Sequence, residues 1–233
     1  MIEFITNGQK NFEIRVFYIN FAVEKMNTDH LIIVIGRQFG AGGRAIGHAL
    51  ASRLGMAYYD KNLLEKAAEE FGLSSEIFAR ADEKRPSVIK QFLALSYGVT
   101  DAYSRDTLSG ENLFNAQSEV IRLLASKGPA VFVGRTADYI LRDEPGLVSV
   151  FLHADDECRT KRIVERGDAP DADKAIELAR RRDKDREGYY NYFTGRRWGK
   201  AETYHITFDA SFLSPEQGAD IIEAFARASG KIK

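Results

Sequence analysis

The stretch that decides the fold is "LIIVIGRQFGAGGRAIGHALASRLG", residues 31–55. It begins with a run of branched apolar residues, a pattern typical of a strand buried on both faces of a parallel sheet. After a glycine-rich turn, Ile46, Leu50 and Leu54 recur at the spacing of one helix face. Gly55 follows at the place where a glycine commonly ends a helix. The stretch therefore predicts a strand, a tight loop and a helix.

The rest of the chain repeats this alternation of strand and helix. Further predicted strands lie at 56–60, 129–135, 147–154 and 204–209, and further predicted helices at 63–72, 118–128, 155–167 and 214–228. Strands that alternate with helices indicate a three-layer α/β fold, in which a parallel sheet has helices on both faces. Segment 74–112 is interrupted by Pro86, Gly98 and Gly110, and we interpret it as a helical insertion on the substrate side.

Composition narrows the class of protein. A chain of 233 residues that is 44% hydrophobic is large enough for one domain with a small insertion or lid. Its 33 basic and 34 acidic residues nearly cancel, so we expect no nucleic-acid partner. A single cysteine, Cys158, excludes an internal disulfide, and no apolar run reaches the ~18 residues that span a membrane. We expect a cytoplasmic protein without a membrane partner; the sequence does not indicate its oligomeric state.

The first 25 residues lack the basic, apolar and small-residue regions of a secretory signal. The strand expected to open the fold begins only at Leu31. Our hypothesis is that translation starts at Met26, so that residues 1–25 are an appendage and residues 26–233 form the domain. Mass spectrometry of the natively expressed protein tests this, and an intact N-terminus at Met1 would contradict it.

The loop after the first strand is the usual phosphate-binding position in a sheet of this type. Gly40, Gly42 and Gly43 can adopt positive φ and bring backbone N–H groups near phosphate oxygens, beside the positive end of the helix that follows. Compared with G-x-x-x-x-G-K-[ST], however, the first glycine is replaced by Arg37, the lysine by Gly43 and the hydroxyl residue by Arg44. The alternative is a glycine turn that only lets the helix pack closely on the sheet.

Two features compensate chemically for the missing lysine and hydroxyl. Either Arg37 or Arg44 can supply the cationic charge on the β- and γ-phosphates, with a bidentate fork instead of a point charge. Magnesium would be held mainly by the nucleotide phosphates and water. We predict no protein metal site, because His48, His153 and Cys158 lack metal-ligand spacing.

Three segments, "IGRQFGAGGRAIGHALASRLGMAYYDKNLL", "AVFVGRTADYIL" and "DKDREGYYNYFTGRRWG", together resemble the cytidylate kinase-like family, relatives of bacterial cytidylate kinase within the nucleoside monophosphate kinases. The similarity runs in the same order from about residue 31 to near the C-terminus. It implies a P-loop nucleoside kinase-type fold with a helical insertion and a lid, nucleotide substrates, and ATP and Mg²⁺ as cofactors. In this family the lysine-less loop is the ordinary form. The residues expected to bind the cofactor are Arg37, Gly40, Ala41, Gly42, Gly43 and Arg44.

The resemblance also implies residues for the phosphate acceptor. Bacterial cytidylate kinases carry Gly-Arg-Asp after a strand, and the arginine contacts the monophosphate. Gly134 and Arg135 match this motif, whereas Thr136 replaces the aspartate, so only the role of Arg135 carries over. A structural salt bridge is the alternative for Arg135. Asp60, at the end of the second strand, either lines the monophosphate pocket or caps the following helix.

The lid of those kinases carries an Asp and an Arg three residues apart, for ribose or base contacts and for phosphate. Asp183 and Arg186 have this spacing, which places them on one helix face. The segment 178–200 has eight basic and three acidic residues, a net charge of +5, as suits a mobile lid over a transferring phosphate. A solvated helix face is the alternative. Most lid aromatics are expected to anchor the lid and not to stack on a base; they are Tyr189, Tyr190, Tyr192, Phe193 and Trp198.

Together these features predict transfer of the ATP γ-phosphoryl group to a small acceptor, with a pyrimidine nucleoside monophosphate such as CMP as the leading candidate. Loop amides, Arg44, Arg135, Arg186 and Mg²⁺ would stabilise the developing charge without a covalent intermediate. The acceptor would be held by Asp60, Arg135, Asp183 and Arg186. The alternatives are a non-catalytic nucleotide-binding or sensor protein, a kinase for a non-nucleotide small molecule and, as a weaker idea, RNA binding through the lid.

Overall fold

Strand β1 (Ile32–Arg37) lies in the middle of the sheet, where its apolar residues are buried on both faces. The computed structural model describes residues 30–60, 62 and 110–232. In this part of the chain the strands form one sheet in the order β2-β3-β1-β4-β5, and every pairing is parallel. The other strands are β2 (Ala57–Tyr59), β3 (Ala130–Val133), β4 (Leu147–His153) and β5 (Ile206–Asp209). The predicted parallel α/β sheet is confirmed.

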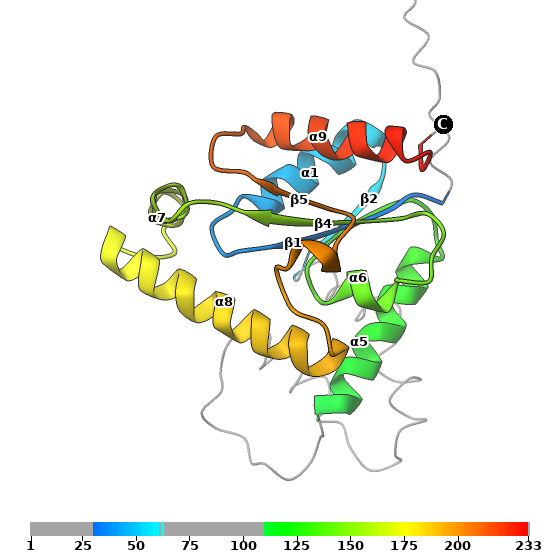
Figure 1. Ribbon diagram of the computed structural model, residues 1–233, viewed down its shortest axis with the longest axis horizontal. Helices are drawn as coiled ribbons and strands as arrows, with labels where there is room; N and C mark the ends of the chain where they lie inside the picture. The colour runs from blue at the N-terminus through cyan, green and yellow to red at the C-terminus, as the bar shows by residue number, and fades with distance from the viewer. Residues whose placement is uncertain (1–29, 61, 63–109, 233) are drawn as a thin grey trace, which may run out of the picture.

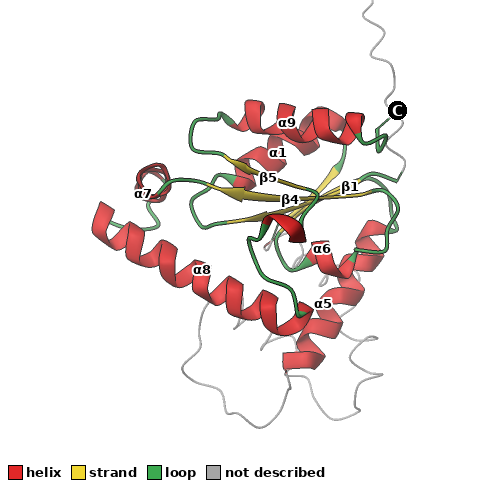
Figure 2. Cartoon of the chain, in the orientation of Figure 1, coloured by secondary structure: helices red, strands yellow, loops and turns green. Residues whose placement is uncertain are grey.

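Helices cover both faces of this sheet (Figure 1 and Figure 2). Helices α1 and α9 lie on one face, while α5 and α6 lie on the other, and α8 runs beneath the sheet from α7 towards α5. Helix α7 lies beyond the arrowhead of β4, at the carboxyl edge. The helix bounds are α1 (Gly43–Leu54), α5 (Gly110–Ala125), α6 (Ala137–Ile140), α7 (Asp156–Glu165), α8 (Ala172–Thr194) and α9 (Pro215–Ala228), with a short 3₁₀ turn, η1 (Ala201–Thr203).

The alternation of side chains along β1 builds two separate apolar cores. Ile33 and Ile35 belong to the core beneath α1 and α9, together with Leu50. Ile32 and Val34 point the other way into a second core. That core also contains Ile121, Leu124, Phe132 and Ile140. Because each strand residue is buried on one side or the other, the uninterrupted apolar run seen in the sequence is the one that a central strand requires.

Most predicted elements agree with the structure, with differences at the ends. Helix α1 ends as predicted, with Gly55 in the left-handed region at φ 65°. The helix predicted from Ser118 instead begins earlier, at Gly110. The conformational-entropy cost of glycine applies to the interior of a helix, and Gly110 is the first helical residue. The appendage 1–25, the helix 63–72 and nearly all of the insertion 74–112 lie outside the described residues, as does the proposed start at Met26.

The predicted lid segment 178–200 falls on α8 and the loop that follows it. Asp171 caps the first turn of α8, and Gly195 ends the helix in the left-handed conformation. Asp183 and Arg186 lie on one face of this continuous helix, as predicted, with Nη1 of Arg186 3.8 Å from Oδ1 of Asp183. Among the helices in the described residues, none is long and apolar enough to cross a membrane.

Candidate active site

The glycine-rich loop connects β1 to α1 at the carboxyl edge of the sheet. Gly40 and Gly42 both have φ 85°, the left-handed region that glycine adopts without strain. Gly42 is the N-cap of α1, no side chain caps this end, and the first turn holds no acidic residue. The positive end of α1 therefore faces the loop without compensation from its own side chains. Gly43, for which positive φ was also expected, is instead the first helical residue.

The side chain of Arg37 explains why residue 43 is a glycine. A Cβ added at Gly43 would lie 2.9 Å from Cγ of Arg37 and 3.2 Å from its Cβ. A Cβ added at Gly134, in the loop after β3, would overlap Nη1 of the same arginine. The stem of Arg37 thus passes over the start of α1, and its guanidinium lies against the neighbouring loop.

Four arginines from four different elements interact electrostatically at this loop. Arg37 ends β1, Arg44 lies in the first turn of α1, Arg135 follows β3, and Arg186 lies on α8. Burial, and then the charges of the other three, lower the pKa of Arg37 well below its usual value. Burial also lowers the pKa of Arg186 to about 10, although Asp183 opposes this shift. Among residues 30–60, 62 and 110–232, no carboxylate forms an ion pair with Arg37.

The turn that carries Arg135 has an unusual backbone. Three consecutive residues, Gly134, Arg135 and Thr136, have φ of 79°, 62° and 58°. For a residue with a Cβ this region costs roughly 1–2 kcal/mol. The carbonyl oxygen of Arg135 accepts a hydrogen bond from Nε2 of Gln117, at 2.9 Å, and the side chain of Thr136 is buried. Such conformations concentrate at functional sites, so this turn is a candidate for ligand contact.

A second set of contacts joins the loop to side chains of α7 and α8. The N–H of Phe39 donates to Oδ1 of Asp183 at 2.7 Å, and the carbonyl oxygen of Phe39 accepts from Nε of Arg159 at 2.8 Å. Arg159 also forms an ion pair with Oδ2 of Asp183. Arg186 donates from Nη1 to the carbonyl oxygen of Arg37, at 3.1 Å. These contacts fasten α7 and α8 to the loop. Both oxygens of Asp183 have protein partners, and its predicted contact with substrate stays a prediction.

Arg159 was missed by the sequence analysis. It is one of several arginines on α7 and α8, and no spacing distinguishes it from its neighbours. Its side chain is only 5% exposed, and a Cβ at Gly40 would lie 2.9 Å from its carbonyl oxygen. Gly40 therefore serves close packing of the loop on α7 as well as the left-handed turn, so the packing alternative for the glycines holds here alongside the phosphate hypothesis.

Asp60 lies beside the loop and also acts as a local cap. Its Oδ1 accepts from the N–H of Asn62 at 3.0 Å, while Oδ2 lies 3.6 Å from Nε of Arg44. The side chain of Arg44 is 54% exposed, so solvent weakens this ion pair. Both interpretations of Asp60 are compatible with these contacts. Its bond from the N–H of Asn62 fits a cap after β2, and its contact with Arg44 places it beside the start of α1, next to the glycine-rich loop.

Asp138 on α6 and the aromatic residues of the predicted lid have mainly structural contacts. Asp138, two residues beyond Thr136, is buried and accepts a hydrogen bond from the Tyr190 hydroxyl at 2.6 Å. Burial raises the pKa of Asp138, and the bond from Tyr190 opposes this shift. Phe193 stacks on Phe114 with ring centroids 4.6 Å apart. Trp198 packs edge-on against Phe151. The expected anchoring role is therefore confirmed for Tyr190, Phe193 and Trp198, whereas Tyr192 is 72% exposed.

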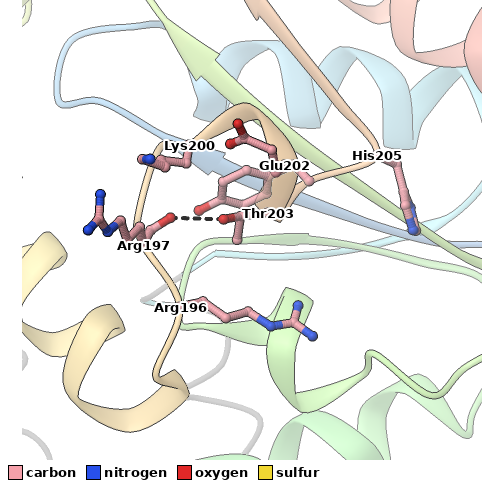
Figure 3. Close-up of a pocket in the computed structure, with 7 residues that line it drawn as sticks. Arg196, Arg197, Lys200, Glu202, Thr203 and His205 are labelled. Carbon is pink, nitrogen blue, oxygen red and sulfur yellow. Dashed lines mark hydrogen bonds between the residues drawn. The ribbon is translucent and has the colours of Figure 1, made fainter.

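A basic pocket lies elsewhere, between the end of α8 and the start of β5. Its volume is about 650 Å³, and Arg196, Arg197 and Lys200 line it together with His205. Figure 3 shows the guanidinium groups of Arg196 and Arg197 pointing away from each other. His205 directly precedes β5, so this pocket is near the amino end of that strand, opposite the glycine-rich loop. The cationic side chains of this pocket do not converge on one point (Figure 3), unlike the arginines at the glycine-rich loop.

The chemistry around the loop suits phosphate oxygens better than a metal held by protein ligands. Arg44 stands where a hydroxyl would reach a cation, and a guanidinium has no lone pair for coordination. Within the described part of the chain, no group of three His, Cys, Asp or Glu side chains is placed to hold a metal ion. A magnesium ion at this loop would therefore take its ligands from phosphates and water.

The parallel sheet, its strand order and the glycine-rich loop after the central strand define a protein of the P-loop kinase fold class. More specifically, the chain belongs to the cytidylate kinase-like family, whose model matches residues 32–212. No curated protein matches the chain.

Solved structures support this fold assignment. An uncharacterized protein from Eubacterium ventriosum ATCC 27560 is 26% identical, with a TM-score of 0.63 over 85% of this chain and 99% of its own. A gluconokinase from Sinorhizobium meliloti 1021 is 16% identical, with a TM-score of 0.51 over 86% of this chain and 94% of its own. A shikimate kinase from Acinetobacter baumannii is 16% identical, with a TM-score of 0.50 over 87% and 95%. At 16% identity, the last two comparisons show the fold alone.

Proposed function

We propose that this protein transfers the γ-phosphoryl group of ATP to a small phosphate acceptor. The observation that carries the proposal is the convergence of four arginines on the glycine-rich loop, with no carboxylate of the described residues paired to Arg37. Like charges at close range raise the free energy of the site, and a bound polyanion reverses this cost. Membership of the cytidylate kinase-like family supports phosphoryl transfer as the class of reaction.

The ATP phosphates would lie on the loop at the start of α1. Backbone N–H groups of residues 40–44 and the uncapped helix end favour negative charge there. The proposed cofactor-binding residues are the loop set Arg37, Gly40, Ala41, Gly42, Gly43 and Arg44. Magnesium fits this arrangement only through phosphate and water ligands, and when bound it would neutralise charge on the phosphates.

The acceptor would lie on the side of the loop formed by β2, β3 and α8. Arg135 and Arg186 are the proposed clamps for its anionic group, because guanidinium forks match phosphate oxygens. Asp60, beside Arg44, is proposed to contact the acceptor, and Asp183 is proposed to do so once its bond to Phe39 rearranges. CMP is the leading acceptor because Gly134 and Arg135 match the motif of bacterial cytidylate kinases, and the family match supports that choice.

Catalysis in this proposal is positioning and charge stabilisation. The γ-phosphoryl group passes between two oxygen atoms in line, and negative charge spreads over its equatorial oxygens. Arg44, Arg135 and Arg186 would stabilise that charge, while the hydrogen bond from Arg159 to the carbonyl oxygen of Phe39 keeps the loop amides in place. No covalent intermediate with the protein is required.

The test is ADP release from ATP and Mg²⁺ with a panel of acceptors. CMP, dCMP and UMP test the nucleotide proposal, and shikimate and gluconate test a non-nucleotide acceptor of the kind named for the fold neighbours. We expect turnover that depends on CMP and falls about 100-fold in Arg135→Ala, the scale of losing one charge-stabilising donor. Thermal stabilisation by ATP without ADP release for any acceptor would overturn the kinase proposal and leave a nucleotide-binding protein.

A further inference from the structure

The lysine position of the phosphate loop is vacant in sequence but filled in space. Gly43 stands where a lysine would begin, and the stem of Arg37 lies over it, with Cγ 2.9 Å from the place of a Gly43 Cβ. Arg37 comes from the opposite end of the same loop, at the last residue of β1. A side chain at residue 43 and the side chain of Arg37 therefore cannot occupy this space together.

Two glycines from different loops form the seat of this arginine. Gly43 leaves room for the stem, and Gly134 leaves room for the guanidinium, because a Cβ there would overlap Nη1 of Arg37. Gly134 follows β3, which pairs directly with β1, so both glycines lie at the same edge of the sheet. An arginine that needs two glycines and has no ion-pair partner in the described residues is positioned for a ligand and not for the fold.

Arg44, the other cation open to this role on sequence grounds, is placed differently. Its side chain is 54% exposed and its Nε lies 3.6 Å from Asp60. It stands at the sequence position of the hydroxyl residue of the usual loop. Solvent and a carboxylate already screen its charge, whereas the strongest charge interactions of Arg37 are with three other arginines.

We propose that the Arg37 guanidinium is the phosphate-binding cation of this loop and takes over the role of the missing lysine from the opposite end of the loop. The ligand class is an inorganic or nucleoside polyphosphate. The identity of ATP as that ligand rests on the function proposed above, but the assignment of Arg37 to a polyphosphate does not. Burial and three neighbouring arginines disfavour the charged guanidinium, and a bound polyanion reverses this.

The experiment is a reciprocal exchange measured by calorimetric binding of inorganic tripolyphosphate and, separately, of ATP. The variants are Arg37→Gly, Gly43→Lys and the double variant Arg37→Gly/Gly43→Lys, which restores the usual positions of the glycine and the lysine. Arg142→Gly is the matched control, because Arg142 lies on an exposed turn after α6. Thermal unfolding of each variant shows that it is folded.

We expect Arg37→Gly to weaken tripolyphosphate binding by about 10- to 100-fold, the scale of one or two hydrogen bonds to a charged group. Gly43→Lys alone should also bind more weakly, because its side chain collides with Arg37. The double variant should recover most of the affinity of the wild-type protein, and Arg142→Gly should retain all of it.

Two outcomes overturn the assignment: tripolyphosphate affinity within about twofold of wild type in folded Arg37→Gly, or a double variant as weak as the sum of its single changes. A wild-type protein that binds tripolyphosphate through Arg37, yet neither binds ATP nor releases ADP, supports the assignment and overturns the proposed function. Wild-type protein that binds neither ligand overturns both.

Discussion

Two arginines contact the glycine-rich loop, Arg159 at Phe39 and Gly40 and Arg37 at Gly43, and the charges around them differ in sign. Arg159 is buried behind the loop, bonded to the carbonyl oxygen of Phe39 and paired with Asp156 and Asp183. The stem of Arg37 lies over Gly43, and its strongest charge interactions are with three more arginines. We therefore expect the loss of Arg159 to destabilise the fold, because it removes a cation from buried carboxylates, and the loss of Arg37 to weaken the binding of an anion.

The largest effect should come from replacing Arg159, the arginine that is paired with carboxylates. Arg159→Met removes the closer of the two ion-pair partners of buried Asp183 and frees the Phe39 carbonyl, so the free energy of unfolding should fall by about 3 kcal/mol. Urea unfolding followed by circular dichroism measures this. Arg180→Met is the control, because Arg180 also pairs with Asp156 but its side chain is 71% exposed; its loss should be under about 0.5 kcal/mol. Similar losses in both variants would contradict the structural role of Arg159.

Replacing Arg37 should instead lower activity and leave the stability of the fold unimpaired. Arg37→Met keeps the stem over Gly43 but removes the charge, and kcat/KM for phosphoryl transfer should fall about 100-fold. The free energy of unfolding should not fall, because the lowered pKa of Arg37 means that the folded state disfavours its charged form. Activity and urea unfolding are measured on the same preparation. A stability loss as large as that of Arg159→Met would erase the contrast between the two arginines.

A smaller change tests the seat of Arg37. Gly43→Ala adds a Cβ within 2.9 Å of the Arg37 stem, which must shift, and ATP affinity should fall about 10-fold, equivalent to ~1.4 kcal/mol. Calorimetric titration with ATP measures it. Gly188→Ala is the matched glycine-to-alanine control, because nothing lies within 4 Å of its added Cβ. In the middle of α8 that change should leave ATP affinity unaltered and stabilise the helix by roughly 0.5–1 kcal/mol.

The smallest effect concerns a third buried charge, Asp138, whose hydrogen-bond partner is the neutral hydroxyl of Tyr190. Burial raises its pKa in the folded state, so its contribution to stability is complete at acidic pH and is lost as pH rises through that folded pKa. Asp138→Asn removes this loss. The free energy of unfolding of the variant, relative to wild type, should therefore increase from pH 4 to pH 7. A constant difference across this range would show that Asp138 keeps its ordinary pKa.

Much of the fold was predictable because its signals are local. The apolar run at β1, the spacing of Ile46, Leu50 and Leu54, and the left-handed Gly55 each depend on neighbours in the chain. The parallel sheet followed from the alternation of strands and helices. The start of α5 at Gly110 was not predicted, because a glycine in the sequence predicts an interruption, whereas its entropic cost applies to the interior of a helix.

The candidate site was predictable only in part. The loop glycines, Arg135 and the pair Asp183–Arg186 came from motif spacing and family resemblance. The sequence left the choice between Arg37 and Arg44 open, because one precedes the loop glycines and the other follows them. Only the packing of the folded chain distinguishes the two arginines. Arg159 had no sequence signal at all, since its partner Phe39 lies in a segment that folds next to α7 only when the sheet has formed.

By itself, the sequence determined the elements, their parallel arrangement and the cationic, lysine-less character of the loop, because hydrophobic period, glycine conformation and charge are properties of short segments. The tertiary structure alone decided which arginine lies among other arginines over Gly43 and which fastens the loop to α7 and α8. That choice depends on residues more than a hundred positions apart, such as Phe39 and Asp183 or Arg37 and Arg186, whose contacts exist only after β1, α7 and α8 have packed together.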